Sequence, residues 1–127
     1  NILGKNSVST GKHCIAAGNL LLKESLTQEM ISNFENDKSD HLAERLILAL
    51  KAGVDYGGEE GPTHSSAILV ADEYQWPLVD LRVDWSENCP VEKLVELWHS
   101  YKPQMNDYIL RAVDPSKAPS YGVPGDI

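Results

Sequence analysis

Hydrophobic and polar residues alternate most regularly over residues 78–85, where the sequence reads Leu-Val-Asp-Leu-Arg-Val-Asp-Trp. Successive side chains of an extended strand point to opposite faces of its sheet, so this pattern predicts a β-strand with one apolar face. The apolar face carries Val79, Leu81, Val83 and Trp85. The other face carries an acid-base-acid row made of Asp80, Arg82 and Asp84. This row is a candidate site if another layer covers it, and ordinary surface if it faces water.

Two further strands are predicted from shorter apolar runs. Residues 66–71 are almost continuously apolar, which is typical of a strand buried on both faces. The short connection at residues 74–77 favours an antiparallel hairpin between this strand and residues 78–85. Residues 13–17 predict another strand that stops at the following Gly-Asn pair, whereas residues 1–13 predict a loop. Three strands are few beside the predicted helices, which indicates that part of the sheet is missing.

Between the predicted strands at residues 13–17 and 66–71, apolar residues recur at helical spacing in two segments. The first helix begins with a capping box formed by Ser25 and Gln28. Its apolar stripe consists of Leu26, Met30, Ile31 and Phe34. The second helix has the strongest pattern and covers residues 42–54, with Ser39 or Asp40 as its predicted N-cap.

Two more helices are predicted after the hairpin. Pro90 suits the first position of a helix, with Asn88 or Cys89 as its cap, and Pro103 ends it. Residues 104–112 predict a last helix. The sequence therefore predicts an α+β fold in which helices pack on a mainly antiparallel sheet.

The length and charge of the chain agree with the predicted α+β fold, and they argue against nucleic-acid binding. A chain of 127 residues suggests one domain, large enough to fold without a disulfide or a metal. The formal net charge is −8 and the basic residues are scattered singly, which argues against nucleic-acid binding. No apolar run approaches the ~18 residues of a membrane span, so no membrane partner is expected.

The cysteines and histidines do not predict a metal or cofactor site. Cys14 and Cys89 lie far apart in unrelated contexts and are interpreted as separate thiols, although they could pair if the protein is exported. The four histidines do not have zinc-ligand spacing. A cytoplasmic location is favoured over export. The chain opens with Asn1 instead of an initiator Met, which indicates that it is processed or cut from a longer polypeptide.

Two groups of polar residues are candidates for chemistry. His64 and Ser66 share one side of a predicted strand and offer a base and a hydroxyl, but no third orienting group can be identified. The alternative is the start of a strand, with Ser66 hydrogen-bonded to backbone. In the row of Asp80, Arg82 and Asp84, Arg82 could bind a ligand carboxylate with two hydrogen bonds. The alternative is a salt-bridge ladder on the surface.

Three stretches of the chain resemble a known family. Gly-Asn-Leu-Leu at residues 18–21 is similar to the family's Gly-Asn-Met-Leu turn, and a Met-x-x-x-Phe helix follows at Met30 and Phe34. Leu-Ala-Glu-Arg-Leu at residues 42–46 is similar to its Leu-Ala-Glu-Arg-Leu helix. The strands with Val-Asp-Leu-Arg-Val-Asp at residues 79–84 are similar to its paired strands. The chain thus resembles the bacterial domain-of-unknown-function family 1028, placed among the N-terminal-nucleophile (Ntn) hydrolase-like folds.

This resemblance implies a layered α-β-β-α sandwich, of which this chain matches only the second half. Residues 1–113 would form the Ntn-hydrolase-like half domain, and residues 114–127 a Pro-rich C-terminal arm. In such hydrolases the nucleophile is a Thr, Ser or Cys at a chain terminus. Asn1 cannot serve, so the chain alone lacks a usable nucleophile, which would lie on the first half.

The function that the resemblance implies is the hydrolysis of amide bonds in a small-molecule substrate. This chain would contribute pocket and oxyanion residues, with Asn19 and Ser66 in catalytic roles. The expected substrate-binding residues are His64, Asp80, Arg82 and Asp84. For Asn19 the alternative is a turn residue in a left-handed conformation. The alternative function is a non-catalytic binding or assembly module, because an exposed apolar sheet face would favour a homo-oligomer or pairing with the missing half.

Overall fold

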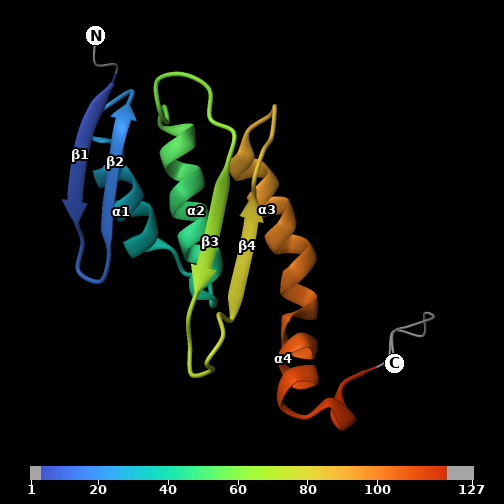
Figure 1. The fold of residues 1–127 in the computed structure, drawn as a ribbon. Coiled ribbons are helices and arrows are strands. Elements are labelled where there is room, and N and C mark those ends of the chain that lie inside the picture. The colour runs from blue at the N-terminus through green and yellow to red at the C-terminus, as the bar shows by residue number, and fades with distance from the viewer. Residues whose placement is uncertain (1–3, 120–127) are drawn as a thin grey trace.

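The computed structural model of the protein describes residues 4–119 and shows two β-hairpins packed against helices. The strands are β1 (Lys5–Thr10), β2 (Ile15–Leu21), β3 (Ser66–Val70) and β4 (Val79–Val83). The helices are α1 (Leu26–Asn36), α2 (Leu42–Asp55), α3 (Pro90–Tyr101) and α4 (Met105–Val113), with short 3-10 turns at Lys102–Gln104 and Pro115–Lys117. The hairpins lie side by side with α1, α2 and α3 behind them (Figure 1). The predicted α+β fold with antiparallel sheets is therefore confirmed.

The first hairpin corrects the prediction of an N-terminal loop. β1 pairs antiparallel with β2, and Val8 lies opposite Ala17. Ser7 and Ser9 point towards α1, where the hydroxyls of both lie 2.7 Å from the Oγ1 atom of the buried Thr27. Because the inward positions of β1 are serines, the strand carries no apolar alternation from which it could be predicted.

The second hairpin confirms the predicted pairing of β3 with β4 and the alternation along β4. Val79 is fully buried, whereas Asp80 and Arg82 are exposed. The prediction for β3 is wrong for the described part of the chain, because only one face of this strand is buried. Ile68 and Val70 face the core, while the side chain of Leu69 on the other face is 63% exposed.

The core lies between the second hairpin and the helices α2, α3 and α4. Its fully buried members include Trp98 and Leu94 of α3 and Ile47 of α2, all packed with Val79. The indole Nε1 of Trp98 donates to the carboxylate of Glu44 at 3.4 Å. This arrangement matches the predicted apolar stripes of α2 and α3, and it fixes the second hairpin on the helices.

The helix starts were predicted with mixed success. Pro90 occupies the first position of α3 after Cys89, as expected. The capping box at Ser25 is wrong, because its hydroxyl bonds to the Tyr56 hydroxyl at 3.0 Å and makes no cap. The cap of α2 is His41, whose Nδ1 accepts from the Ala43 amide at 3.0 Å. The His41 ring also packs on Trp98 of the core. Because of this tertiary contact, His41 occupies the N-cap position of α2, which was predicted for Ser39 or Asp40.

The two hairpins leave one broad face without a covering layer in the described part of the chain. We call this side, opposite the helices, the uncovered sheet face (Figure 1). Its apolar members are Val8, Ile15, Ala17, Ala67 and Leu69, and its charged members are Asp80 and Arg82. The side chains of Val8 and Ile15 are 70% and 71% exposed. Large apolar side chains gathered on one exposed side of a protein mark an interaction surface more often than ordinary protein surface.

Several expectations concern residues away from this face. Within residues 4–119, no helix combines the length and the apolar character that crossing a membrane requires. In the same range, no three His, Cys, Asp or Glu side chains are grouped so as to hold a metal ion. Cys14 and Cys89 are both free thiols, as predicted. The predicted C-terminal arm is described only as far as Pro119, whose carbonyl accepts a hydrogen bond of 2.9 Å from the guanidinium of Arg111 in α4. Residues 120–127 of the arm lie outside the described residues.

Glu35, near the end of α1, ties the turn of the first hairpin to the helices. Its Oε1 accepts from the amides of Lys12 at 2.7 Å and His13 at 3.2 Å, and from the Cys14 thiol at 3.7 Å. The His13 amide, more than any other group, holds the pKa of the Glu35 carboxyl below its ordinary value. A carboxyl with a lowered pKa stabilises the fold above its unfolded pKa, and this stability is lost as the pH falls through the folded pKa.

We therefore predict that Glu35→Gln makes the free energy of unfolding less sensitive to acid. The variant loses stability at pH 7, and its difference from the parent protein shrinks as the pH falls. Urea unfolding from pH 7 down to about pH 3 measures this. Glu29→Gln, at an exposed carboxylate on the first turn of the same helix, is the control. A constant difference between Glu35→Gln and the parent at every pH would contradict the prediction.

Candidate functional site

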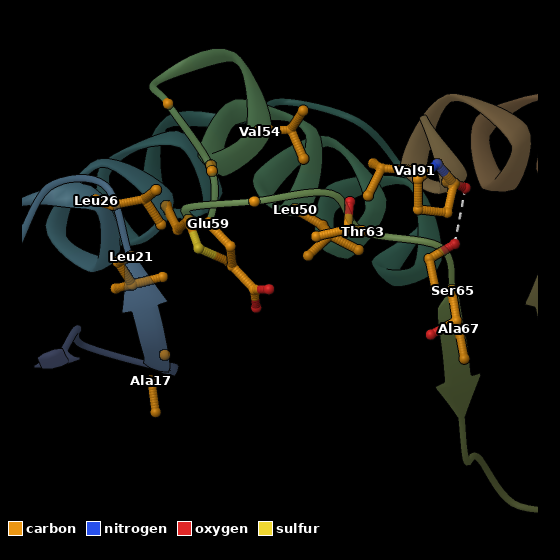
Figure 2. Close-up of a pocket in the computed structure, with 18 residues that line it drawn as sticks. Ala17, Leu21, Leu26, Leu50, Val54, Glu59, Thr63, Ser65, Ala67 and Val91 are labelled. Carbon is orange, nitrogen blue, oxygen red and sulfur yellow. Dashed lines mark hydrogen bonds between the residues drawn. The ribbon is translucent and has the colours of Figure 1, made fainter. Parts of the chain in front are cut away.

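A cleft of about 440 Å³ opens between β2 and β3, and we call it the hairpin cleft (Figure 2). Its floor consists of apolar residues of α1 and α2, namely Leu26, Met30, Leu50, Gly53 and Val54. Its walls are small residues of the two strands and the segment before β3, namely Ala17, Gly18, Ser65, Ser66 and Ala67. The polar groups of the rim include Glu59 and Thr63, and Figure 2 shows the Glu59 side chain between the two strands. An apolar floor with a few polar groups is the usual composition of a ligand pocket.

The cleft exists because a glycine-rich segment carries the chain from α2 towards β3. Gly57 and Gly58 have φ angles of 141° and 62°, which side chains other than glycine rarely adopt. They turn the chain so that it runs back beside the end of β2. There the Leu22 amide donates to the Gly58 carbonyl at 2.9 Å, and the Glu60 amide donates to the Leu20 carbonyl at 2.7 Å. This segment closes one end of the cleft.

Asn19, the predicted oxyanion residue, lies in β2 one residue beyond Gly18 of the cleft wall. Its side chain is exposed, as is that of Ala17 two positions earlier, so both belong to the uncovered sheet face. The alternative interpretation, a left-handed turn at Asn19, is wrong. The strand continues through this residue, and Leu20 has the left-handed φ of 56°. The oxyanion role itself stays a prediction.

Ser66 and His64 have separate backbone partners. The Ser66 hydroxyl, in the cleft wall, donates to the Pro90 carbonyl at 2.8 Å (Figure 2), as the structural interpretation of this serine predicted. The His64 Nδ1 lies 2.9 Å from the Ser86 carbonyl, and the ring stacks on Trp85 with 3.8 Å between centroids. A carbonyl only accepts, so Nδ1 carries the proton, and in the neutral ring Nε2 is the acceptor. Their catalytic and substrate-binding roles stay predictions.

The acid-base-acid row lies on the uncovered sheet face and at its margin. The guanidinium of Arg82 contacts the Asp84 carboxylate at 3.1 Å, and these side chains are 68% and 81% exposed. Asp80 lies opposite Leu69 across the hairpin, and Arg82 lies opposite Ala67. The described part of the chain thus presents the row as surface next to an apolar area. Its role in binding a substrate stays a prediction.

The position of Glu59 and Thr63 at the rim of a cleft was not predicted from the sequence. Glu59 and Thr63 lie in the segment 57–65, which contains four glycines or prolines. This segment pairs with the end of β2, where Leu21 bridges Glu59 from 38 positions earlier in the chain. The available signal was the glycine-rich stretch between a helix and a strand, which marks a loop that approaches other backbone closely. The pairing of this loop with β2 has no local signature.

The fold defines a class of α+β proteins with two antiparallel hairpins on a layer of helices. The chain belongs to the family described as "Family of unknown function (DUF1028)", whose model matches residues 1–94. It is similar to the crystal structure of protein SPO2555 from Silicibacter pomeroyi, also described as DUF1028, with a TM-score of 0.71 and 27% sequence identity. The match covers 84% of this chain but 45% of that chain, so this chain spans less than half of that protein. No curated protein matches the chain.

Proposed function

We propose that this chain is part of an amide-bond hydrolase of the Ntn type, in which a second β-sheet covers the uncovered sheet face. The observation that carries the proposal is the exposure of Val8, Ile15 and Leu69, whose side chains are 63% to 71% exposed on the same side of the two hairpins. Covering three such residues would stabilise an assembly by several kcal/mol, at about 1.5 to 3 kcal/mol for each fully buried aliphatic side chain.

The comparison with SPO2555 supports a source for the covering sheet. That protein has more than half of its chain outside the match, which is enough polypeptide to form another sheet with its own helices. Packing that sheet on the uncovered face would give the layered α-β-β-α arrangement, with this chain as the second half. The space between the two sheets would then contain Asn19 and the row from Asp80 to Asp84.

In this assembly the present chain binds and positions the substrate, and the nucleophile comes from the other half. The side-chain amide of Asn19 donates a hydrogen bond to the oxyanion that forms when the nucleophile attacks the carbonyl carbon of the substrate. Arg82 exchanges its partner Asp84 for a substrate carboxylate, which a guanidinium binds with two parallel hydrogen bonds. Ser66 contributes to the pocket wall rather than to bond making, because its proton is directed at the Pro90 carbonyl.

The second candidate function is a non-catalytic assembly module. The side-chain bonds of Ser66 and His64 to backbone carbonyls favour it, because these two residues then have structural roles. The same uncovered sheet face would pair with another chain without forming an active site. The two candidates differ only in whether the assembled protein has activity.

Substitution of Asn19 tests the hydrolase proposal. In the complete gene product, assayed against a panel of small amides and lactams, Asn19→Ala is expected to lower kcat about 100- to 1000-fold with little change in KM. Asn33→Ala, at an exposed residue of α1 on the helical side of the molecule, is the matched control and keeps full activity. Activity of Asn19→Ala equal to that of the parent would refute the oxyanion role. An inactive parent protein across the whole panel would leave the assembly module as the function.

A further inference from the structure

We propose that the hairpin cleft is a β-strand acceptor. One extended segment of polypeptide enters between β2 and β3 and joins the two hairpins into a single five-stranded sheet. The inference rests on the proposed function, because that proposal supplies the source of the segment. The source is polypeptide equivalent to the part of SPO2555 that lies outside the match with this chain.

The backbone of β2 offers one unpaired edge to the cleft. The Gly11 amide donates to the Cys14 carbonyl at 2.7 Å and closes the turn of the first hairpin. In an antiparallel pair, alternate residues direct their amides and carbonyls to the partner strand and the others direct theirs away. Counting from this closing pair, Ala16 and Gly18 bond to β1, so Ile15 and Ala17 direct their backbone groups away from β1. Ala17 lines the hairpin cleft, and both residues line a hollow that continues from it between the two hairpins.

The backbone of β3 offers a second unpaired edge across the same cleft. The Val70 carbonyl accepts from the Leu78 amide at 2.7 Å, and the His64 carbonyl accepts from the Ser86 amide at 2.8 Å. The even-numbered residues therefore bond towards β4. By the same alternation, Ala67 and Leu69 direct their amides and carbonyls away from β4, towards the hairpin cleft and the hollow that continues from it. Two rows of main-chain donors and acceptors thus border one opening.

At one end of the cleft, a segment of the chain already pairs through its backbone with the free edge of β2, as we propose for the entering strand along the remaining length of that edge. Beyond the left-handed Leu20, Leu21 forms an isolated antiparallel bridge with Glu59. Two main-chain hydrogen bonds of 2.7 and 2.9 Å flank this bridge. The segment around Glu59 therefore acts as a short third strand on the β3 side of β2. An entering strand would continue this line of pairing along Ile15 and Ala17.

The side chains of the cleft leave space for a strand and indicate its composition. Ala17, Gly18 and Ala67 in the walls are small, and the floor is apolar. One face of the entering strand would rest on the Leu26, Met30 and Leu50 side of the cleft, and its other face would extend the apolar area between Ile15 and Leu69. A strand buried on both faces is almost continuously apolar. β2 and β3 run in opposite directions (Figure 1), so the strand is parallel to one and antiparallel to the other.

The chemistry of the two walls favours polypeptide over a small molecule. Unpaired strand edges with exposed amides and carbonyls are templates for a further strand, and proteins normally cover them. A small amide substrate would satisfy one or two of these groups. Only an extended backbone satisfies both rows over the length of Ile15 to Ala17 and Ala67 to Leu69.

Hydrogen exchange of the complete gene product tests the inference. The amides of Ala17 and Leu69 are expected to exchange at least about 100-fold more slowly than in the isolated 127-residue chain. Ala67→Pro removes an amide that faces the cleft and is expected to destabilise the complete gene product. Thr10→Pro, at an exposed residue at the end of β1, removes an amide that points away from β2, and it is the matched control for the loss of an edge donor.

The outcomes separate this inference from the proposed function. If the side chains of the uncovered sheet face are protected while the Ala17 and Leu69 amides exchange at equal rates in both proteins, a sheet covers the face but no strand enters the cleft. That result refutes the inference and leaves the proposed function standing. Fast exchange together with exposed side chains in the complete gene product would refute both.

Discussion

Replacing Trp98 by alanine is expected to destabilise the protein more than any other single truncation in the described core, by about 3 to 5 kcal/mol. The indole is 1% exposed and packs among residues of α2, α3 and the second hairpin. Its removal leaves a cavity at the place where the helices contact β4, and it takes away the donor to Glu44. Such a loss is a large share of the 5 to 15 kcal/mol that stabilises a typical domain. Urea unfolding measures it.

Trp76→Ala is the matched control for this prediction. Trp76 lies in the connection between β3 and β4, is 41% exposed and stacks on Tyr74 with 5.0 Å between ring centroids. We expect its removal to cost about 1 kcal/mol or less, in the range of surface substitutions. Equal losses for the two variants would show that the core does not centre on Trp98.

Leu69→Lys is expected to have the second large effect, and only in the complete gene product. Leu69 lies in the middle of the uncovered sheet face, directly opposite Asp80. In the isolated chain the introduced ammonium is solvated and can pair with this carboxylate, so stability changes by less than about 0.5 kcal/mol. Under a covering sheet the same charge loses its water, and the assembly loses several kcal/mol.

The control for this prediction is Leu48→Lys on the helical side of the molecule. Leu48 lies in α2 and is 36% exposed, and its substitution should affect the isolated chain and the complete gene product equally. Thermal or urea unfolding of all four proteins gives the comparison. If Leu69→Lys leaves the complete gene product unchanged, the uncovered sheet face is in contact with water there too.

The parts of the fold that could be predicted are those whose periodicity is apolar. In β4 every second residue is buried or half-buried, beginning with Val79, so the alternation was sufficient to predict the strand. In α3 one helical stripe is buried, so the spacing of Leu94 and Trp98 was sufficient to predict the helix. The strand β1 could not be predicted, because Ser7 and Ser9 fill its inward positions and bond to Thr27. Polar pairing between segments has no local periodicity.

The site was less predictable than the fold because it depends on contacts between distant segments. Residues 66–71 were predicted to be buried on both faces, and the described chain buries one. Under the proposed function, the second layer over Leu69 comes from the other half of the assembly, and residues 66–71 are then buried on both faces. The hairpin cleft depends on the return of the Glu59 segment to β2. Neither feature can be derived from residues that are neighbours in sequence.

Hydroxyl-radical footprinting of Val8, Ile15 and Leu69 tests the central claim most directly. It compares the reactivity of these three side chains in the isolated 127-residue chain and in the complete gene product. A covering sheet predicts strong protection of all three in the complete gene product, with Leu48 equally reactive in both samples. Equal reactivity of Val8, Ile15 and Leu69 in the two samples would contradict the account, because the uncovered sheet face would then face water.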